Sequence, residues 1–196
     1  MVVVKETRTG IASDLDPKLR LRLRDHLQPP SMTDEELFSL MELGIPQKTF
    51  DTGLVIGRFQ PPHFGHLFLM MQALRVCDKI AIGIGSANVI NDKNPFPIDI
   101  REQLLREAIH DLGITSRVAK VAPLNDFRND QKWFENTLLQ IGQFDVVIGN
   151  NEDGVNRVFR ERGIPAIGTP LLERNTYRGE RIRGELIAEG LLGQIT

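Results

Sequence analysis

Residues 54–67 read Leu-Val-Ile-Gly-Arg-Phe-Gln-Pro-Pro-His-Phe-Gly-His-Leu and carry the strongest structural signal in the chain. The apolar run Leu54–Gly57 predicts a short buried strand. Pro61 and Pro62 then predict a turn, because proline cannot donate to a strand ladder. Gly65–Arg75 follows with the apolar spacing of a helix. The stretch therefore predicts a strand, a turn and a helix, which together make the first half of a βαβ unit.

The same alternation of strands and helices continues along the chain. Further strands are predicted at Ile80–Gly85, Val118–Val121, Asp145–Gly149 and Ala166–Gly168, and further helices at Asp99–Leu112, Gln131–Ile141 and Gly154–Glu161. Strands that alternate with helices of about 10–15 residues predict a parallel sheet covered by helices on both faces. We therefore expect an α/β, Rossmann-like, doubly wound fold with about five parallel strands. Ligands of such sheets bind beyond the carboxyl ends of the strands.

Residues 1–51 differ from the rest and predict a helical extension to a domain at 52–196. Asp16 followed by Pro17 is typical of a helix start, and that helix is expected over Lys18–Leu27. A capping box at Thr33–Glu36 predicts a second helix that closes at Gly44. We interpret this extension as a packing or oligomer contact rather than as part of the chemistry.

Composition restricts the classes of function. The 196 residues include 24 Lys and Arg and 26 Asp and Glu, so the formal net charge is −2. A protein that coats nucleic acid is usually strongly basic, so we expect no nucleic-acid partner. Cys77 is the only cysteine, which excludes an intrachain disulfide and a multi-thiolate metal site. No apolar run approaches the ~18 residues that span a bilayer, and Met1–Val4 is too short for a signal peptide. We expect a cytoplasmic protein with no membrane partner.

The turn after the first predicted strand favours an anion site. His63 and His66 are three residues apart on a first helical turn, so both imidazoles can lie toward one side. Unpaired N–H groups and the positive end of the helix dipole attract an anion at the same place. Gly65 lets a phosphate approach the backbone, and Arg58 adds a donor fork that suits phosphate oxygens. A zinc site would need a third ligand, and the remaining two histidines lie in segments with no obvious route to this turn.

These residues resemble the HxGH signature of the nucleotidyltransferase superfamily. The wider form, GRFQPxHxGH, is similar to that of the archaeal-type nicotinamide mononucleotide adenylyltransferases, and the resemblance extends from about Leu54 to Glu189. Further matches to the family pattern are Gly83–Ala87, Asn94–Phe96, Arg101–Glu102, Pro123, Asp126, Trp133 and Asp145–Asn150.

The resemblance implies an enzyme in which a phosphate oxygen of nicotinamide mononucleotide attacks the α-phosphorus of ATP, giving NAD and pyrophosphate. It implies that His63, His66, Arg183 and Arg58 are catalytic. The residues that it implies for ATP are Gly57, Arg58, Phe59, Gln60, His63, Gly65, His66, Gly149, Asn150, Arg178, Gly179, Ile182 and Arg183. The residues that it implies for the nicotinamide nucleotide are Ser86, Ala87, Asn94, Asp126 and Trp133. Mg²⁺ is expected with ATP, held mainly by phosphate and water oxygens rather than by the protein. We also expect a homo-oligomer.

Trp133, the only tryptophan, has two interpretations. Its broad face suits a cationic nicotinamide ring, whereas ordinary core packing is the alternative. The spacing between Asp126 and Trp133 favours contact with the substrate. Asp126 could orient nearby backbone or meet the cationic ring.

The second signature of the superfamily, [ST]GTxIR, is altered here. It reads Tyr-Arg-Gly-Glu-Arg-Ile-Arg over residues 177–183, so Arg178 and Glu180 replace small hydroxyl residues. Three arginines and one glutamate leave this helix start with a local net charge of +2. Glu180 either pairs with an arginine or helps to hold magnesium. Two further functions stay open. One is a related transferase that uses CTP or another acceptor phosphate, because base choice rests on backbone contacts that a sequence does not display. The other, which Glu180 in place of a hydroxyl residue suggests, is a regulatory domain that binds a nucleotide without turnover.

Overall fold

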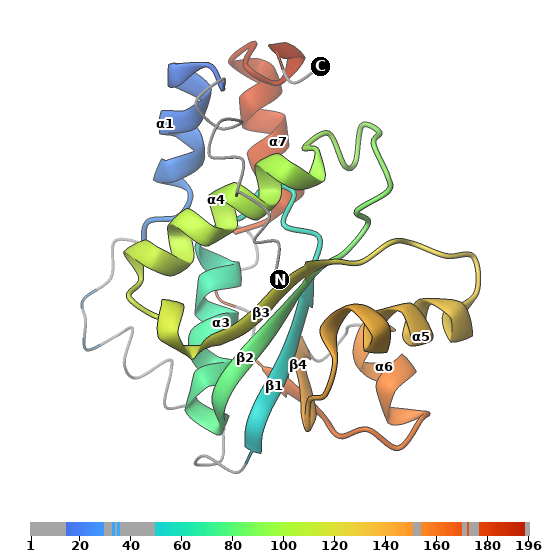
Figure 1. Ribbon diagram of the computed structural model, residues 1–196. Coiled ribbons are helices and arrows are strands. Elements are labelled where there is room, and N and C mark those ends of the chain that lie inside the picture. Colours follow the sequence, from blue (N-terminus) through green and yellow to red (C-terminus); the bar gives the residue numbers. More distant parts are fainter. Residues whose placement is uncertain are drawn as a thin grey trace, which may run out of the picture.

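The computed structural model describes residues 15–29, 33, 35, 50–150, 154–169, 172 and 177–194. Within these residues a single parallel sheet has the strand order β3-β2-β1-β4-β5 (Figure 1). The strands are β1 (Phe50–Gly57), β2 (Cys77–Ile84), β3 (Val118–Pro123), β4 (Val146–Asn150) and β5 (Ala166–Thr169). The chain winds from β1 through β2 to β3, then returns to β4 on the other side of β1. The carboxyl ends of β1 and β4 are therefore the switch point at which doubly wound sheets bind ligands.

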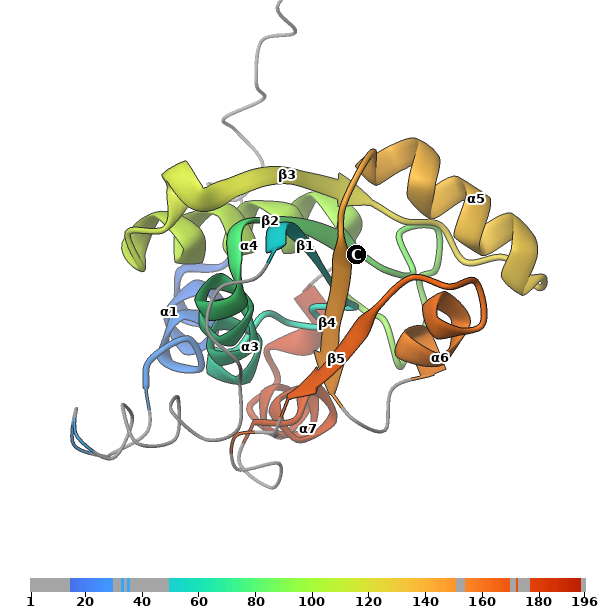
Figure 2. The same cartoon turned by 90° about the horizontal axis from the view of Figure 1, so that it is seen from below.

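Helices cover both faces of this sheet. The described helices are α1 (Pro17–Asp25), α3 (Phe64–Val76), α4 (Ile98–Asp111), α5 (Asp130–Ile141), α6 (Gly154–Arg160) and α7 (Gly179–Ala188), with short 3₁₀ turns η2 (Thr115–Arg117) and η3 (Leu192–Gln194). Helices α3 and α4 lie on one face and α5 and α6 on the other (Figures 1 and 2). The expected α/β, Rossmann-like, doubly wound fold is thus confirmed.

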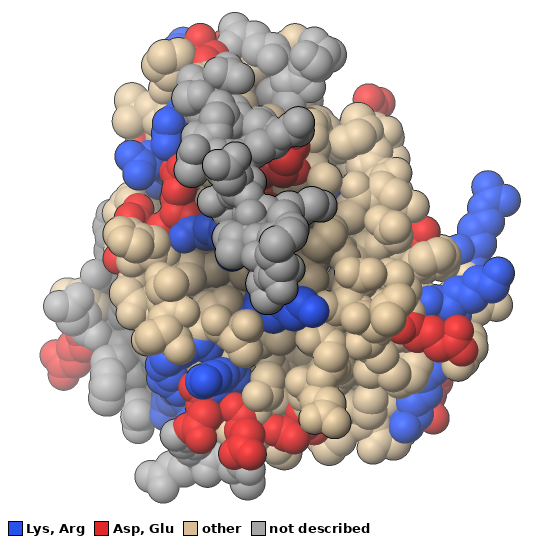
Figure 3. All heavy atoms as spheres, viewed as in Figure 1, with Lys and Arg blue, Asp and Glu red and all other residues tan. Residues whose placement is uncertain are grey.

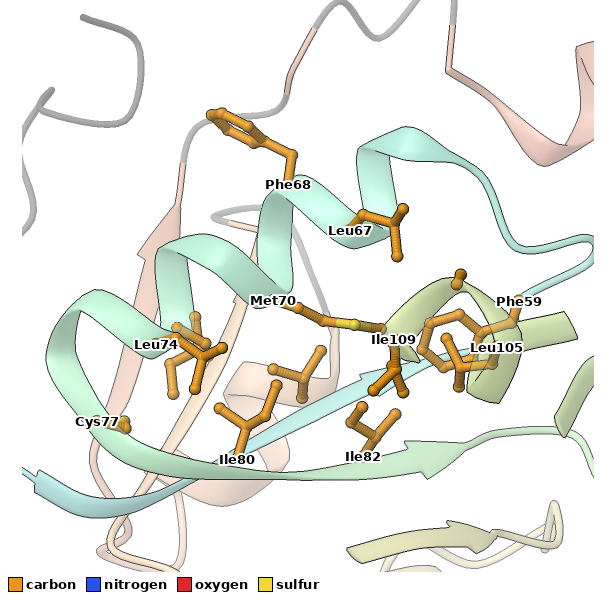
Figure 4. Packing of buried hydrophobic residues seen from close by; sticks show 14 of the residues in the cluster. Phe59, Leu67, Phe68, Met70, Leu74, Cys77, Ile80, Ile82, Leu105 and Ile109 are labelled. Atoms are coloured by element: carbon orange, nitrogen blue, oxygen red, sulfur yellow. The ribbon is translucent and has the colours of Figure 1, made fainter. Parts of the chain in front are cut away.

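Alternation along β1 divides the core between the two faces. Val55 packs into a cluster with residues of α3 and α4, whereas its neighbours Leu54 and Ile56 pack into a cluster under α5 and α6. Figure 4 shows the first cluster, in which Met70 of α3 lies among side chains from β2 and α4. A strand that is buried on both faces requires apolar residues in succession, which is the run that the sequence shows.

The predicted elements agree with the observed ones to within a few residues. The largest difference is at β1, which starts at Phe50 rather than Leu54. Residues 50–53 extend this strand because they pair with the start of β2. The Asp145 carboxylate also accepts the backbone N–H groups of Asp51 and Thr52 at 3.1 and 2.8 Å. The first helix of the extension is α1, and the second falls on residues 33–44, of which the structure describes only 33 and 35.

The described helices and surface charges show neither a membrane span nor, on the face in Figure 3, a patch of one charge. No described helix is both long and apolar enough to cross a membrane. On the face shown in Figure 3, the described Lys and Arg side chains lie among Asp and Glu side chains.

Candidate active site

The loop between β1 and α3 is held in one conformation by side-chain hydrogen bonds. Phe59 has a φ of 51°, which is uncommon for a residue other than glycine. The Gln60 side chain donates to the carbonyl of Phe96 at 3.0 Å and accepts the N–H of Phe96 at 2.9 Å. This reciprocal pair ties the loop to the segment before α4, so the residues that follow it have a defined position.

His63 and His66 meet at the end of this loop. His63 is the N-cap of α3, and its ring centroid lies 3.8 Å from that of His66. The backbone N–H of His63 donates to Nδ1 of His66 at 3.3 Å. Because Nδ1 of His66 accepts this bond, the proton of the neutral ring belongs on Nε2. His66 therefore offers an Nε2–H donor.

Burial keeps both imidazoles neutral. Burial, with a smaller contribution from the nearby His26, lowers the pKa of His63 to about 3. Burial also lowers the pKa of His66 well below its usual value, and the neighbouring His63 acts in the same direction. The two histidines thus act at neutral pH as hydrogen-bonding groups rather than as cations. Positive charge at this site comes from other residues.

The N-terminus of α7 lies against the same loop. Arg183 donates from Nη1 to the carbonyl of Gln60 at 2.7 Å, across 123 residues of sequence. Burial lowers the pKa of Arg183, and the nearby Arg58 lowers it further, but a guanidinium keeps its proton in proteins. A Cβ on Gly179 would lie 2.7 Å from the Gln60 oxygen, which is closer than a real side chain allows. Glycine is therefore required where α7 approaches the loop.

A cavity of about 500 Å³, here termed the histidine cavity, opens between these elements. It is lined by Arg58, Phe59, Gln60, His63, His66, Lys93, Arg178, Gly179, Glu180 and Arg183. Among these described lining residues, four carry a positive charge and one a negative charge. The start of α7 adds the positive end of a helix dipole. A site of this charge suits a ligand with several negative groups.

A second cavity of about 510 Å³, the tryptophan cavity, lies at the switch point of the sheet. It is lined by Ile56, Gly57, Arg58, Gly85, Ser86, Asp126, Trp133, Asn150, Gly154 and Val155. The Ser86 hydroxyl donates to the Asp126 carboxylate at 2.7 Å, so this carboxylate has a fixed position. Trp133 also packs edge-on against Phe159, with ring centroids 5.8 Å apart. It thus contributes to the core and to the cavity wall. Arg58 lines both cavities.

Arg101 holds backbone of both cavity walls in place, a role that was not predicted from the sequence. Its side chain is fully buried and donates to the carbonyls of Arg58, Gly85 and Ser86 at 2.7, 2.8 and 3.1 Å. These carbonyls follow β1 and β2. The available signal was an arginine on the apolar stripe of a predicted helix, beside Ile100 and Leu104.

The structure brings most of the predicted site residues together. The histidine cavity combines the four predicted catalytic residues with Phe59, Gln60, Arg178 and Gly179, and adds Lys93, which no sequence signal identified. The tryptophan cavity combines Ser86, Asp126 and Trp133 with two residues predicted for ATP, Gly57 and Asn150.

Five predicted residues line neither cavity: Gly65, Ala87, Asn94, Gly149 and Ile182. Ile182 is buried in the cluster between α1, α4 and α7. The amide of Asn94 donates to Asn91 at 3.0 Å, and Gly149 lies against the side chain of Asn156. Glu180 lies close enough to Arg183 to raise the pKa of that guanidinium, and Arg181 donates to Glu185 at 2.8 Å.

Comparison with known proteins identifies the family. Residues 54–184 match the family model described as cytidylyltransferase-like. A nicotinamide-nucleotide adenylyltransferase from Methanolobus tindarius is 37% identical over 133 residues, which cover 67% of this chain and 75% of the relative. One from Archaeoglobus fulgidus is 34% identical over 137 residues, which cover 67% of this chain and 78% of the relative.

Solved structures give a similar result. The crystal structure of a bifunctional NMN adenylyltransferase/ADP ribose pyrophosphatase from Francisella tularensis has a TM-score of 0.62 and 29% sequence identity. The match covers 72% of this chain and 43% of that one, so this protein spans less than half of its length. A second structure of such an enzyme from this organism, complexed with AMP and a Mn ion, has a TM-score of 0.58 at 28% identity, over 71% of this chain and 42% of that one. The chain thus belongs to the cytidylyltransferase-like family of nucleotidyltransferases and is a homologue of the archaeal nicotinamide-nucleotide adenylyltransferases.

Proposed function

We propose that this protein transfers an adenylyl group from ATP to nicotinamide mononucleotide, giving NAD and pyrophosphate. Relatives that are more than 30% identical carry this activity in their names. The observation that carries the proposal is the histidine cavity, in which two neutral imidazoles lie among four cations.

The reaction explains why the site has this composition. A phosphate oxygen of the acceptor attacks the α-phosphorus of ATP, and the bond from that phosphorus to the bridging oxygen breaks as pyrophosphate leaves. The nucleophile is already an anion, so no general base is needed. The difficulty is to bring two anionic groups into line. Fixed position and positive charge therefore supply most of the rate acceleration.

Each lining residue has a role in this scheme. The Nε2–H of His66 donates to the phosphate oxygens on which charge develops, with His63 beside it. Arg183, fixed by Gln60, holds the pyrophosphate end at the start of α7. Arg58 neutralises charge between the two nucleotides, because it lines both cavities.

The acceptor belongs in the tryptophan cavity. Trp133 offers an aromatic face to the cationic nicotinamide ring, and Asp126 offers a carboxylate that is already oriented by Ser86. Asn150 and Gly57 line this cavity at the switch point, where doubly wound sheets bind nucleotides.

We propose Mg²⁺ as the metal that accompanies ATP. Among the described residues no group of three His, Cys, Asp or Glu side chains could hold a metal ion. We expect the oxygens of the triphosphate and of water to be the main ligands, because Mg²⁺ is a hard cation that keeps several waters. Glu180 is the one carboxylate among the described lining residues of the histidine cavity, and the Glu180→Thr variant tests its contribution. Bound there, the ion would neutralise charge on the phosphates.

A pyrophosphate-release assay tests this function. ATP and CTP are each supplied with nicotinamide mononucleotide, with sugar phosphates and with alcohol phosphates. We expect turnover with ATP and nicotinamide mononucleotide, and NAD as the second product. Preferred turnover of CTP with another acceptor would replace this proposal with that of a related transferase. Nucleotide binding without turnover of any pair would identify a regulatory domain.

A cytoplasmic location and a homo-oligomeric state stay predictions. Sedimentation velocity over a range of protein concentrations tests the second, and a monomer throughout would contradict it.

A further inference from the structure

Helix α1 precedes the family match, which starts at residue 54, yet it packs into the body of the protein. Leu19 and Leu23 are 0% and 1% exposed. With Leu15 they form a cluster with Ile100 and Leu104 of α4 and with Ile182 and Leu186 of α7. Helix α1 is therefore part of the surface on which α7 rests, and α7 carries Arg183.

Ion pairs fix the orientation of α1 against α4 and α7. Arg20 donates to Glu107 of α4 at 2.9 Å, and Arg22 donates to Glu189, the C-cap of α7, at 2.7 Å. Bonding to Glu189 raises the pKa of Arg22. Exposed pairs contribute little stability individually. They do specify which side of α1 faces α4 and which end of α7 it meets.

The C-terminal end of α1 reaches the catalytic histidines. The carbonyl of His26, the C-cap of α1, accepts the backbone N–H of Phe64 at 2.7 Å. Phe64 is the first residue of α3, directly after His63. First-turn N–H groups have no partner within their own helix, so this bond fixes the start of α3 from outside. The imidazole of His26 also lies 3.7 Å from Glu185 of α7.

We propose that α1 and His26 are positioning elements for adenylyl transfer. His26 contacts both helices whose N-terminal turns carry the phosphate-binding groups: α3 through its carbonyl and α7 through its imidazole. It thereby sets the separation between the histidine pair and Arg183. The inference rests on the proposed function. It gives α1 a role in the chemistry in addition to the packing contact expected from the sequence.

The variants Phe64→Pro and Phe64→Ala isolate the bond from Phe64 to His26. Both remove the same aromatic ring, but only proline removes the N–H. Proline is tolerated at the first helical position, and His63 already has the extended backbone, with φ −151° and ψ 168°, that precedes proline. Since a displacement of about 1 Å can cost ~10² in rate, we expect kcat to be at least ~10-fold lower for Phe64→Pro than for Phe64→Ala. KM for ATP should differ by less than about twofold, because uniform binding is retained.

Leu23→Ala and Leu74→Ala form a second pair, which decides the question if Phe64→Pro does not fold. Leu23 packs α1 against α4 and α7. Leu74 lies near the C-terminal end of α3, away from His63, in the cluster with β2 (Figure 4). Each variant is assayed below its own melting transition, monitored by circular dichroism. We expect a reduced kcat for Leu23→Ala and an unchanged kcat for Leu74→Ala.

Equal kcat values within both pairs would overturn the inference and assign α1 to stability alone. A wild type without pyrophosphate release would instead refute the proposed function. Histidine NMR separates the two cases, because it needs no turnover. Positioning by α1 predicts that the His63 and His66 ring resonances move in Phe64→Pro relative to Phe64→Ala, and unmoved resonances would overturn it.

Discussion

Replacing Arg101 by methionine tests the idea that one buried cation holds both cavities in shape. Methionine keeps a long apolar stem but removes the guanidinium that donates to the carbonyls of Arg58, Gly85 and Ser86. The variant leaves three buried or partly buried acceptors without their donor. It does so without opening a large void among the apolar residues of α4.

The size of the effect follows from two opposing terms. Hydrogen bonds that involve a charged group contribute roughly 1.5–3 kcal/mol each, and Arg101 makes three of them. Against this, burial lowers the pKa of Arg101 to about 10, which corresponds to a cost of roughly 3 kcal/mol for keeping the charge. We therefore expect Arg101→Met to reduce the free energy of unfolding by roughly 2–6 kcal/mol.

Activity should fall further than stability alone requires. Arg58 lines both cavities and Ser86 orients Asp126, so looser loops after β1 and β2 displace groups on both substrates. A misplacement of about 1 Å costs ~10² in rate, and we expect kcat to fall by about that factor in molecules that remain folded.

Arg106→Met is the matched control on the same helix. Arg106 is exposed and donates to Glu102 at 2.7 Å, an i,i+4 pair that contributes about 0.3–0.5 kcal/mol. Urea unfolding monitored by circular dichroism gives the stability of each variant, and pyrophosphate release gives kcat. If Arg101→Met matches Arg106→Met in both measurements, the reasoning about a central buried cation is wrong.

Four further predictions concern residues of the two cavities. His66→Ala should lower kcat by ~10²–10³ with an unchanged circular dichroism spectrum, since one donor to developing charge is lost; near-normal kcat would remove His66 from the catalytic residues. Trp133→Ala should weaken nicotinamide mononucleotide binding by roughly 0.5–2 kcal/mol with little change for ATP, and calorimetry that shows equal weakening of both would make Trp133 purely structural. Glu180→Thr should keep activity or improve ATP affinity, because a negative charge leaves the cationic cavity; a several-fold higher magnesium requirement in rate titrations would instead make Glu180 a metal ligand. Burial holds the pKa of His63 at about 3 in the folded protein, against an ordinary value of 6.5, so the imidazole stays neutral when folded. The free energy of unfolding should therefore decrease as the pH falls from 6.5 toward 3, by about 2 kcal/mol at pH 5. Urea unfolding should show a smaller acid-induced decrease for His63→Gln than for wild type, and parallel curves would contradict the low pKa.

The strands and helices of the described domain and their order along the chain could be predicted from the amino-acid sequence. Short β-branched or glycine-bounded runs predicted the five strands of the described sheet. The central strands β1, β2 and β4 contain successive apolar residues because both of their faces are buried. The paired histidines at the start of a helix predicted an anion site, since neighbours on one helical turn are brought together by local geometry alone. Capping residues likewise predicted α1, whose N-cap Asp16 accepts the N–H groups of Lys18 and Leu19. Each of these signals depends on residues close together in the chain.

The contacts by which distant segments complete the site could not be predicted from the sequence. Arg101 could be read as a helix residue, but its three carbonyl partners lie 15 to 43 residues away and become neighbours only when β1 and β2 pair. The requirement for Gly179 comes from the Gln60 carbonyl, and the role of His26 comes from the N–H of Phe64. Periodicity and capping report local preference, whereas these contacts depend on the register and docking of whole elements, which arise from the packing of the entire core.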